Sequence, residues 1–539
     1  MKRIMMAALA AVLAACGGGG GGGGGGSGSG SGGAVVTPPV SSDGSSRVVQ
    51  ASCPFTQTLG SSRGDSLRIA AVHWLQSVQL NAADSESRLA GGKAVKLRID
   101  LLASGSPLAP VRRELRVYDP VSATCTSLTV SGPTRVPAAA DAETLDSSFV
   151  ATIPAELVKP GMSVSLVFDD AAGRSSSEAD QVYRVLQPSV SPVVVETVRI
   201  VPLTLLGSTG YVSSNQEIAD LLTRMYPVSR VNVETAAPLN ITSLLLSSLV
   251  SSGGVLTGTI GLMQSLLSQA DDHCADLNGS QRNARTAPKC IVVMPDNLLF
   301  KAASGVGQLV GLAYVGGTTL LTRSVSAVDR TSVISPYLSS HWISYDAMTV
   351  AHEYGHLLDL DHAACGGATG LDSRLYSDGG LGSGAGYDSV RDVYFSAARK
   401  YSDGSAQFAD VMSYCGKEWM SDRGYLAAMA YRAGSASVAA RALDSEADSQ
   451  WLKLSLMPDG WKVRRVSHAP ATLVDSSLVL AVTGSHGPEN LALRSAVVSE
   501  HHEAGGFGPY YIDLGERRVE TLRILSSGIE LAGWSGDDI

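Results

Sequence analysis

The segment from His352 to His362 constrains this chain most, because it sets three histidines and a glutamate in the pattern H-E-x-x-H-x-x-x-x-x-H. If residues 344–358 form a helix, His352 and His356 lie one turn apart on the same face. Two imidazoles at that spacing can bind one zinc ion, and Glu353 can reach a water molecule on the metal. His362 can supply a third nitrogen once the chain turns back. A bare H-E-x-x-H pattern also recurs by chance in long proteins, so further features are needed to distinguish a metal site from an accidental match.

The complete pattern resembles the signature of the metzincins, H-E-x-x-H-x-x-G-x-x-H, a family of zinc endopeptidases. Asp359 stands where the family has a glycine, which lets the helix end in a left-handed turn. Aspartate is one of the few other residues that tolerate this conformation. The departure leaves both His362 and Asp361 as third-ligand candidates, and the register of the family favours His362.

A second segment, D-V-M-S-Y-C at Asp410 to Cys415, resembles the metzincin Met-turn, which places a methionine beneath the zinc ligands. Met412, 50 residues after His362, is the candidate methionine. The M-x-Y form of astacin-like members implies that the hydroxyl of Tyr414 reaches the metal or the oxyanion. The alternatives are ordinary core filling by the methionine and a structural hydrogen bond from the tyrosine. Residues 419–425 also resemble the W-x-S-D-x-x-Y segment of some secreted bacterial metzincins.

The resemblance covers about residues 193–434 and implies that His352, His356 and His362 hold one catalytic zinc ion. Glu353 would then be the general base, which takes a proton from the zinc-bound water and delivers it to the leaving amine. A strand at Gln308 to Val315 would form the upper rim of the cleft and pair with an extended substrate. An ordinary interior strand is the alternative. A gluzincin, the rival zinc class, would need a downstream glutamate as third ligand; Glu418 is available but lacks a matching motif.

Six cysteines follow Cys16, and an even number in an exported chain suggests disulfides. Many connectivities are possible, and reduced buried thiols are the alternative. Their positions favour three pairs, each inside one expected domain: Cys53–Cys125, Cys274–Cys290 and Cys365–Cys415. The last pair would clamp the strand of the third ligand to the Met-turn.

The beginning of the chain is typical of a targeting signal. A basic pair and an apolar run precede L-A-A-C, which resembles a bacterial lipobox with Cys16 as the lipidated residue. A plain secretory signal with a chance cysteine is the alternative. A run of glycines and serines follows and predicts a flexible tether. We therefore expect a signal peptide at residues 1–16 and a linker at 17–50. The protein is then exported and lipid-anchored, at the outer membrane or cell surface.

Strand and helix patterns divide the remaining chain. Short alternating runs predict an antiparallel β-domain at residues 51–192, as a support or recognition module. Strands alternating with helices predict an α/β domain at 193–438 that contains the zinc site. Strand patterns return at 439–539 and predict a C-terminal β-domain. The expected fold is thus multidomain, with a central α/β metzincin-like zinc protease domain between two β-sandwich-like domains.

Within the central region, two helices and two buried strands stand out. Asn215–Met225 and Leu256–Ala270 are predicted to be helices, while Val195–Leu206 and Cys290–Pro295 are predicted to be strands.

Charge and hydropathy narrow the function further. The formal net charge is -9, which argues against a nucleic-acid partner, and no internal apolar run is long enough for a membrane-spanning helix. We expect a monomeric zinc-dependent endopeptidase that hydrolyses extracellular proteins or glycoproteins and contacts the membrane through its lipid anchor. The alternative is a surface adhesin or glycan-binding lipoprotein with an unused metalloprotease core. Zinc content together with cleavage of a denatured protein would distinguish the two.

Overall fold

The computed structural model describes residues 52–535, apart from short segments. The segments without a description are 54, 56–66, 105–108, 111, 169–180, 242–249, 253–254, 280, 282, 302–307, 331–341, 383, 401–406, 416–417, 435–450, 458–459, 467–468, 470–472, 485–486, 498–508, 516 and 518. The expected signal peptide and linker, with Cys16, lie outside the described residues. None of the described helices combines the length and the apolar character needed to cross a bilayer.

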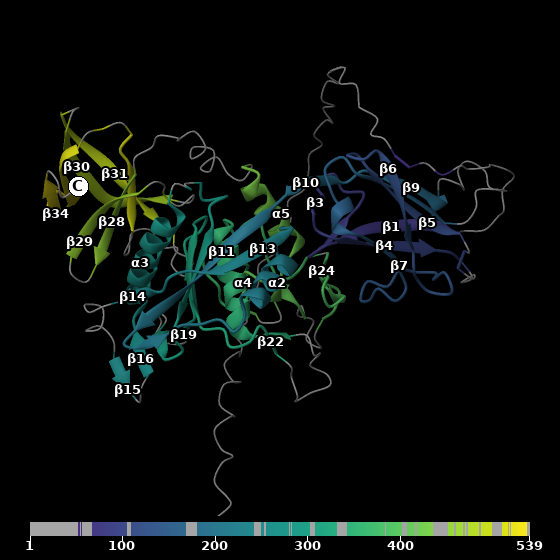
Figure 1. Ribbon diagram of the computed structural model, residues 1–539, viewed down its shortest axis with the longest axis horizontal. Helices are drawn as coiled ribbons and strands as arrows, with labels where there is room; N and C mark the ends of the chain where they lie inside the picture. The colour runs from purple at the N-terminus through teal and green to yellow at the C-terminus, as the bar shows by residue number, and fades with distance from the viewer. Residues whose placement is uncertain are drawn as a thin grey trace, which may run out of the picture. The chain divides into compact units, whose positions relative to one another are not determined.

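The described chain consists mostly of β-sheet, as expected for a β-rich, multidomain protein. Its described residues form four α-helices (Figure 1): α2 Asn215–Met225, α3 Ile260–Asn278, α4 Tyr345–Leu357 and α5 Asp422–Arg432. A short 3-10 helix, η1, spans Ala155–Leu157.

Two antiparallel four-stranded sheets form the N-terminal part. The first has the order β2-β1-β4-β7 and the second β6-β5-β8-β9. Their strands are β1 Arg68–Leu75, β2 Gln79–Asn81, β4 Val95–Leu102, β5 Arg113–Asp119, β6 Thr124–Thr129, β7 Phe149–Ile153, β8 Ser163–Phe168 and β9 Tyr183–Leu186. Leu97 and Ile99 of the first sheet belong to the same buried core as Leu115 and Val117 of the second, so the two sheets share one core. Beside them, β3 (Arg88–Gly91) pairs in parallel with β10 (Ser189–Val193).

A seven-stranded mixed sheet carries the central part of the chain. Its order is β12-β11-β17-β21-β20, and β13 and β14 also pair with β11. The strands are β11 Val195–Leu205, β12 Ser208–Thr209, β13 Arg230–Thr235, β14 Leu239–Ile241, β17 Lys289–Met294, β20 Gly311–Ala313 and β21 Thr319–Arg323. β11, β17 and β21 are parallel, whereas β20 runs antiparallel to β21 at one edge of the sheet.

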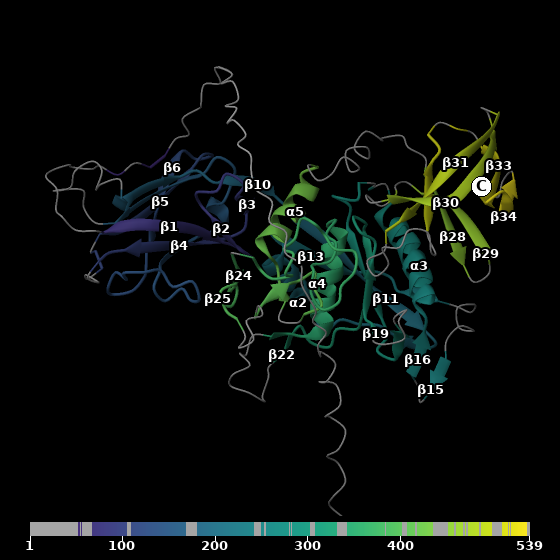
Figure 2. The same cartoon turned by 180° about the vertical axis from the view of Figure 1, so that it is seen from behind.

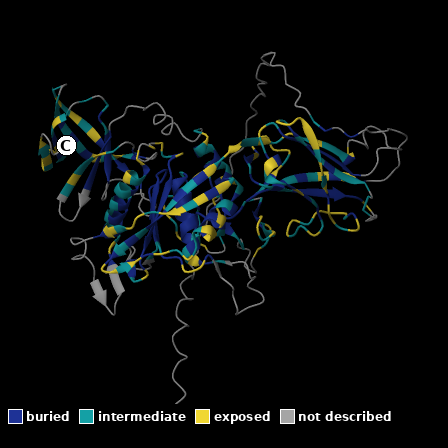
Figure 3. Ribbon diagram, viewed as in Figure 1, coloured by how far each residue is buried: buried dark blue, intermediate teal, exposed yellow. Residues whose placement is uncertain are grey.

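Helices cover both faces of this sheet, which explains why β17 is buried throughout and apolar after Lys289. Ile291 and Val293 belong to the same buried core as residues of α2 and α4. Val292 and Met294, which point to the other side, share a second core with residues of α3. Figure 3 shows the strands of the sheet as a buried centre, and Figure 2 shows α3 and α4 from behind. The helix α4 is therefore anchored on a rigid sheet.

Two expected elements of this region differ from the structure. The helix expected at residues 256–270 begins only at Ile260, because the side chain of Thr259 caps it, and it continues to Asn278. Residues 255–258 form a strand instead. The strand expected at residues 308–315 is split into β19 and β20, which belong to different sheets. The chain changes sheets at Val310, whose carbonyl accepts a hydrogen bond from the backbone of Arg323.

The remaining strands form smaller pairs and one large C-terminal sheet. The smaller strands are β15 Val250–Ser252, β16 Val255–Gly258, β18 Leu298–Lys301, β19 Gln308–Leu309, β22 Asp329–Arg330, β23 Trp342–Ile343, β24 Ala385–Asp388, β25 Val393–Ser396, β26 Ala409–Asp410 and β27 Glu418–Trp419. The C-terminal sheet has the order β29-β28-β32-β31-β30-β33-β34. Its strands are β28 Trp451–Met457, β29 Gly460–Val466, β30 Leu473–Gly484, β31 Gly487–Ala496, β32 Tyr510–Asp513, β33 Val519–Ser526 and β34 Ile529–Ser535.

Three disulfides cross-link the described chain. They join Cys53 to Cys125, Cys274 to Cys290 and Cys365 to Cys415, which are the pairs expected from the sequence. Disulfides form and persist in oxidising compartments, so these bonds indicate an extracellular environment.

Candidate metal centre

The helix α4 carries two of the expected metal ligands. It begins after Ser344, whose hydroxyl oxygen accepts a hydrogen bond from the backbone nitrogen of Ala347 at 3.2 Å. The same hydroxyl donates to the carbonyl of Ala327 at 2.5 Å, which fixes the start of the helix to the preceding loop. His352 and His356 are buried and lie one turn apart, as the spacing predicts.

Asp359 ends the helix in the left-handed conformation predicted for this position, with φ of 64°. The backbone nitrogen of Leu360 donates to the carbonyl of Gly355 at 3.2 Å, and that of Asp359 donates to His356 at 3.0 Å. These two bonds are those of a Schellman motif, which satisfies the last carbonyls of a helix. The turn reverses the chain within a few residues and brings His362 back toward α4.

Arg374 holds this turn through two aspartates, an arrangement that the sequence did not suggest. Its guanidinium contacts the carboxylate of Asp359 at 3.2 Å and also donates to the Asp359 carbonyl. It contacts the buried carboxylate of Asp372 at 2.7 Å, which in turn accepts from the backbone of Asp361 at 3.2 Å. The backbone nitrogen of Asp372 donates to the carbonyl of His362 at 2.9 Å. The loop around the third histidine is therefore fixed at both ends.

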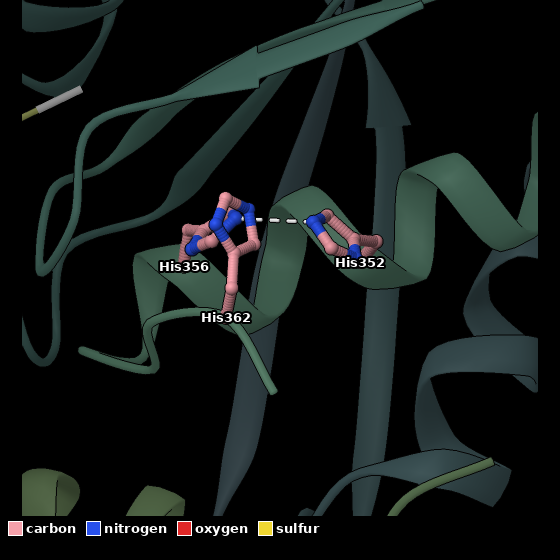
Figure 4. Close-up of side chains that lie close together, drawn as sticks. All are labelled: His352, His356 and His362. Carbon is pink, nitrogen blue, oxygen red and sulfur yellow. Dashed lines mark hydrogen bonds between the residues drawn. The ribbon is translucent and has the colours of Figure 1, made fainter. Parts of the chain in front are cut away.

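Figure 4 shows the three imidazoles close together, and each of them is oriented by a hydrogen bond at Nδ1. Nδ1 of His352 lies 2.8 Å from the carbonyl of Val411. Nδ1 of His356 lies 2.7 Å from the carbonyl of Leu360, and Nδ1 of His362 lies 2.7 Å from the carbonyl of Thr369. A carbonyl oxygen only accepts, so each Nδ1 carries the proton and each Nε2 presents a lone pair. Such support is usual around metal-binding histidines, because it fixes the tautomer and the ring.

The Nε2 atoms are spaced as ligands of one metal ion. Nε2 of His352 and Nε2 of His356 are 3.2 Å apart (the dashed line in Figure 4). With both protons on Nδ1, these atoms cannot hydrogen-bond to each other, whereas two nitrogens bound tetrahedrally to zinc would be about 3.3 Å apart. The ligand atoms of His352, His356 and His362 all lie within 4.8 Å of one another. The three residues present therefore fit a metal ion.

Burial keeps His352 neutral. It is the main cause that lowers the pKa of His352 to about 3, with a further contribution from the nearby His362. A metal ligand must be neutral, so His352 is ready to bind over the ordinary pH range. Among the described His, Cys, Asp and Glu side chains, these three histidines form a cluster that could hold a metal ion. The other candidates for third ligand, Asp361 and Glu418, are not part of it.

Glu353 lies next to the ligands on α4 and is 2% exposed. The edge strand β20 passes so close to it that a Cβ at Gly311 would overlap the carboxylate oxygen Oε1. A glycine is therefore required there, and the backbone of the sheet edge runs beside the expected general base. The expected rim strand is thus at the edge of the sheet, although it is shorter than residues 308–315.

Met412 packs beneath α4. A Cβ at Gly355, between the two histidines of the helix, would overlap the Sδ atom of Met412, so the glycine leaves room for the methionine. The backbone nitrogen of Met412 donates to Asp410 Oδ1 at 2.8 Å, and that of Ser421 donates to Oδ2 at 3.3 Å. This buried carboxylate closes the turn.

Tyr414 extends from the same turn to the histidines. Its hydroxyl lies 2.8 Å from Nε2 of His362, and its side chain is 39% exposed. The backbone of the turn is tied to the third-ligand loop by Ala363, which donates to Met412 at 2.8 Å, and by Tyr414, which donates to Cys365 at 3.2 Å. The Cys365–Cys415 disulfide adds a covalent link between the same two segments.

Comparison of the chain with protein-family models found no match, and comparison with curated proteins found none either.

Proposed function

We propose that this protein is a zinc-dependent endopeptidase of metzincin type. The observation that carries the proposal is the convergence of three Nε2 atoms from His352, His356 and His362, each with its Nδ1 fixed on a carbonyl. A set of three nitrogen ligands suits zinc and leaves one position for substrate or water. Glu353, next to the first ligand, completes the arrangement of a metalloprotease.

The surrounding fold supports this proposal. The mixed sheet with α2 and α4 on one face and α3 on the other is the kind of α/β domain expected for residues 193–438. The left-handed Asp359 and the turn at Met412 would correspond to the glycine and the Met-turn of a metzincin, which supports the proposal. We therefore propose that this part of the chain is a metzincin-like domain.

Each residue of the centre then has a defined task. When bound, zinc would act as a Lewis acid toward the scissile carbonyl and the attacking water. With the metal bound, the carboxylate of Glu353 would accept a proton from the attacking water and pass it to the leaving amine. The hydroxyl of Tyr414, beside His362, can donate to the oxyanion. The backbone of β20 can align an extended substrate as an additional strand.

We infer that the substrate is an extracellular protein or glycoprotein. The three disulfides suit an exported protein, and an anchor on Cys16 with the glycine-rich linker would hold a monomeric enzyme at the membrane surface. A lipid anchor on a flexible tether brings the enzyme to large substrates outside the cell.

The Glu353→Gln variant tests the proposal. We expect it to bind one zinc ion per chain, as wild type does, and to lose cleavage of a reduced, denatured protein by at least about 100-fold. His362→Ala should lose both zinc and activity. Full activity of Glu353→Gln would contradict the mechanism. Stoichiometric zinc without any cleavage by wild type would favour a binding protein with an unused metalloprotease core.

A further inference from the structure

The N-terminal sheets are connected to the metal centre by buried hydrogen bonds. Residues Gln76 and Ser77, which follow β1, are both 0% exposed. Their partners come from the far end of the chain. The hydroxyl of Tyr425 on α5 donates to Oε1 of Gln76 at 2.9 Å, and Nε1 of Trp419 donates to the carbonyl of Ser77 at 2.7 Å. Trp419 and Tyr425 directly follow the Met-turn, so these contacts lie at its base.

A first route leads from Ser77 to the metal ligand His352. Trp419, held by its indole nitrogen on Ser77, uses its backbone carbonyl to accept from the nitrogen of Val411 at 2.7 Å. The carbonyl of Val411 in turn accepts from Nδ1 of His352 at 2.8 Å. Three hydrogen bonds in series thus join the N-terminal part to the ring of the first ligand.

A second route reaches the same place through α2. The ammonium group of Lys93, which is 5% exposed, donates to the carbonyls of Thr223 at 2.6 Å and Tyr226 at 2.8 Å. These carbonyls belong to the end of α2, where a helix lacks internal partners and favours a cation. The hydroxyl of Tyr226 donates to the carbonyl of Ala351 on α4 at 2.5 Å. Ala351 directly precedes His352 in the chain.

We propose that the N-terminal β-domain is a structural component of the metal centre, with Trp419 as a positioning residue that acts on His352 through Val411. The inference rests on the metal site of the proposed function and extends it to residues outside the expected protease domain. The carbonyl of Val411 sets the tautomer and the direction of the His352 ring, so a shift of this carbonyl moves a ligand atom. The buried residues of both parts also belong to one continuous hydrophobic core.

The test uses the full chain with the substitution Trp419→Phe, which removes the indole donor but keeps an aromatic ring. The carbonyl of Ser77 still accepts from the backbone nitrogen of Tyr387, at 2.8 Å, so the loss at this carbonyl is partial. We expect zinc to bind about tenfold more weakly, measured by competition with a chromophoric chelator. The visible absorption of the cobalt-substituted protein should change as well, because it reports on ligand geometry. Tyr226→Phe is a second variant, because it removes the hydroxyl that donates to the Ala351 carbonyl in the second route, and its zinc affinity should fall between those of Trp419→Phe and wild type.

Tyr394→Phe is the matched control. The Tyr394 hydroxyl also joins the two parts of the chain, through Gln79 and Arg98 at 2.8 Å each, but it lies outside both routes. The zinc affinity of Tyr394→Phe should stay within about twofold of wild type. The inference is overturned if Trp419→Phe and Tyr226→Phe bind zinc as tightly as Tyr394→Phe. A wild-type protein that binds zinc but does not cleave would contradict only the proposed endopeptidase activity. The zinc affinities of the variants would still test whether the N-terminal β-domain supports the metal centre.

Discussion

The Cys365–Cys415 disulfide provides a sharp prediction about the third ligand, because it links the segment of His362 to the segment of Met412. The sequence separation is 50 residues. In the chain-entropy treatment of cross-links, a loop of that length stabilises the folded protein by about 4 kcal/mol at 25 °C. The backbone bonds of Ala363 and Tyr414 link the same two segments and do not depend on the disulfide. Replacing both cysteines by alanine should therefore loosen the third-ligand loop without dissolving it.

The Cys274–Cys290 disulfide is an internal control, because it lies in the core beneath α3, on the opposite face of the sheet from α4. Its separation of 16 residues corresponds to about 3 kcal/mol in the same treatment. Both double alanine variants should lower the denaturation temperature by comparable amounts, about 6–8 °C for a unit of about 250 residues. Only the Cys365/Cys415 variant should also weaken zinc binding, by about tenfold, because only this bond fixes a loop that carries a ligand.

Two measurements check this prediction: thermal denaturation of the zinc-loaded proteins, and zinc affinity by chelator competition. Equal zinc affinity in wild type and both variants would refute the reasoning. That result would mean that the hydrogen bonds of His362 and its neighbours suffice to hold the ligand. A loss of affinity in both variants would show that the effect reflects general stability rather than the position of His362.

Three further predictions concern the residues around the histidines. Gly355→Ala should destabilise the protein by about 1–3 kcal/mol in thermal denaturation, because the added Cβ overlaps Met412. The same substitution in a Met412→Ala variant should cost less. If Gly355→Ala alone stabilises the protein, the packing of Met412 against Gly355 is contradicted. Burial raises the pKa of Asp410 to about 6, so its contribution to stability is present below about pH 4 and is lost as the pH rises through 6. The free energy of unfolding of Asp410→Asn, measured in urea at several pH values, should lack this change of about 3 kcal/mol. The same pH profile in wild type and Asp410→Asn would contradict this prediction. Arg374→Gln should lower the free energy of unfolding by about 1–2 kcal/mol and weaken zinc binding. Adding Asp359→Gly to this variant should restore part of the free energy of unfolding, because it removes the backbone strain at position 359. A double variant as unstable as Arg374→Gln alone would count against the network.

Local features of the site could be predicted from the sequence because they depend on spacing along the chain. The helix expected at residues 344–358 is found at Tyr345–Leu357, and Asp359 adopts the left-handed turn expected of it. The end of α3 could not be predicted in this way. Its polar residues after Ala270 interrupt the apolar pattern, but Asp271 and Asp272 are paired with Lys453, far along the chain. A pattern within one segment does not contain that partner.

The support of the site by distant residues escapes a sequence argument for the same reason. Nothing in the local sequence of Gln76 and Ser77 connects them with Trp419 and Tyr425, which lie more than 340 positions away. Both residues are polar, and the structure buries both with their hydrogen bonds satisfied. Buried polar groups keep such partners because an unsatisfied one costs about 1–3 kcal/mol.

Asp359 shows how a departure from the motif that this segment resembles can be compensated elsewhere in the chain. A residue other than glycine in the left-handed conformation costs about 1–2 kcal/mol. Here the side chain that causes this cost also contacts Arg374, which binds Asp372 and thereby the backbone on both sides of His362. The aspartate therefore adds an anchor that glycine does not offer. The motif position can change because the requirement is the direction of the chain after the helix, and Arg374 helps to fix that direction.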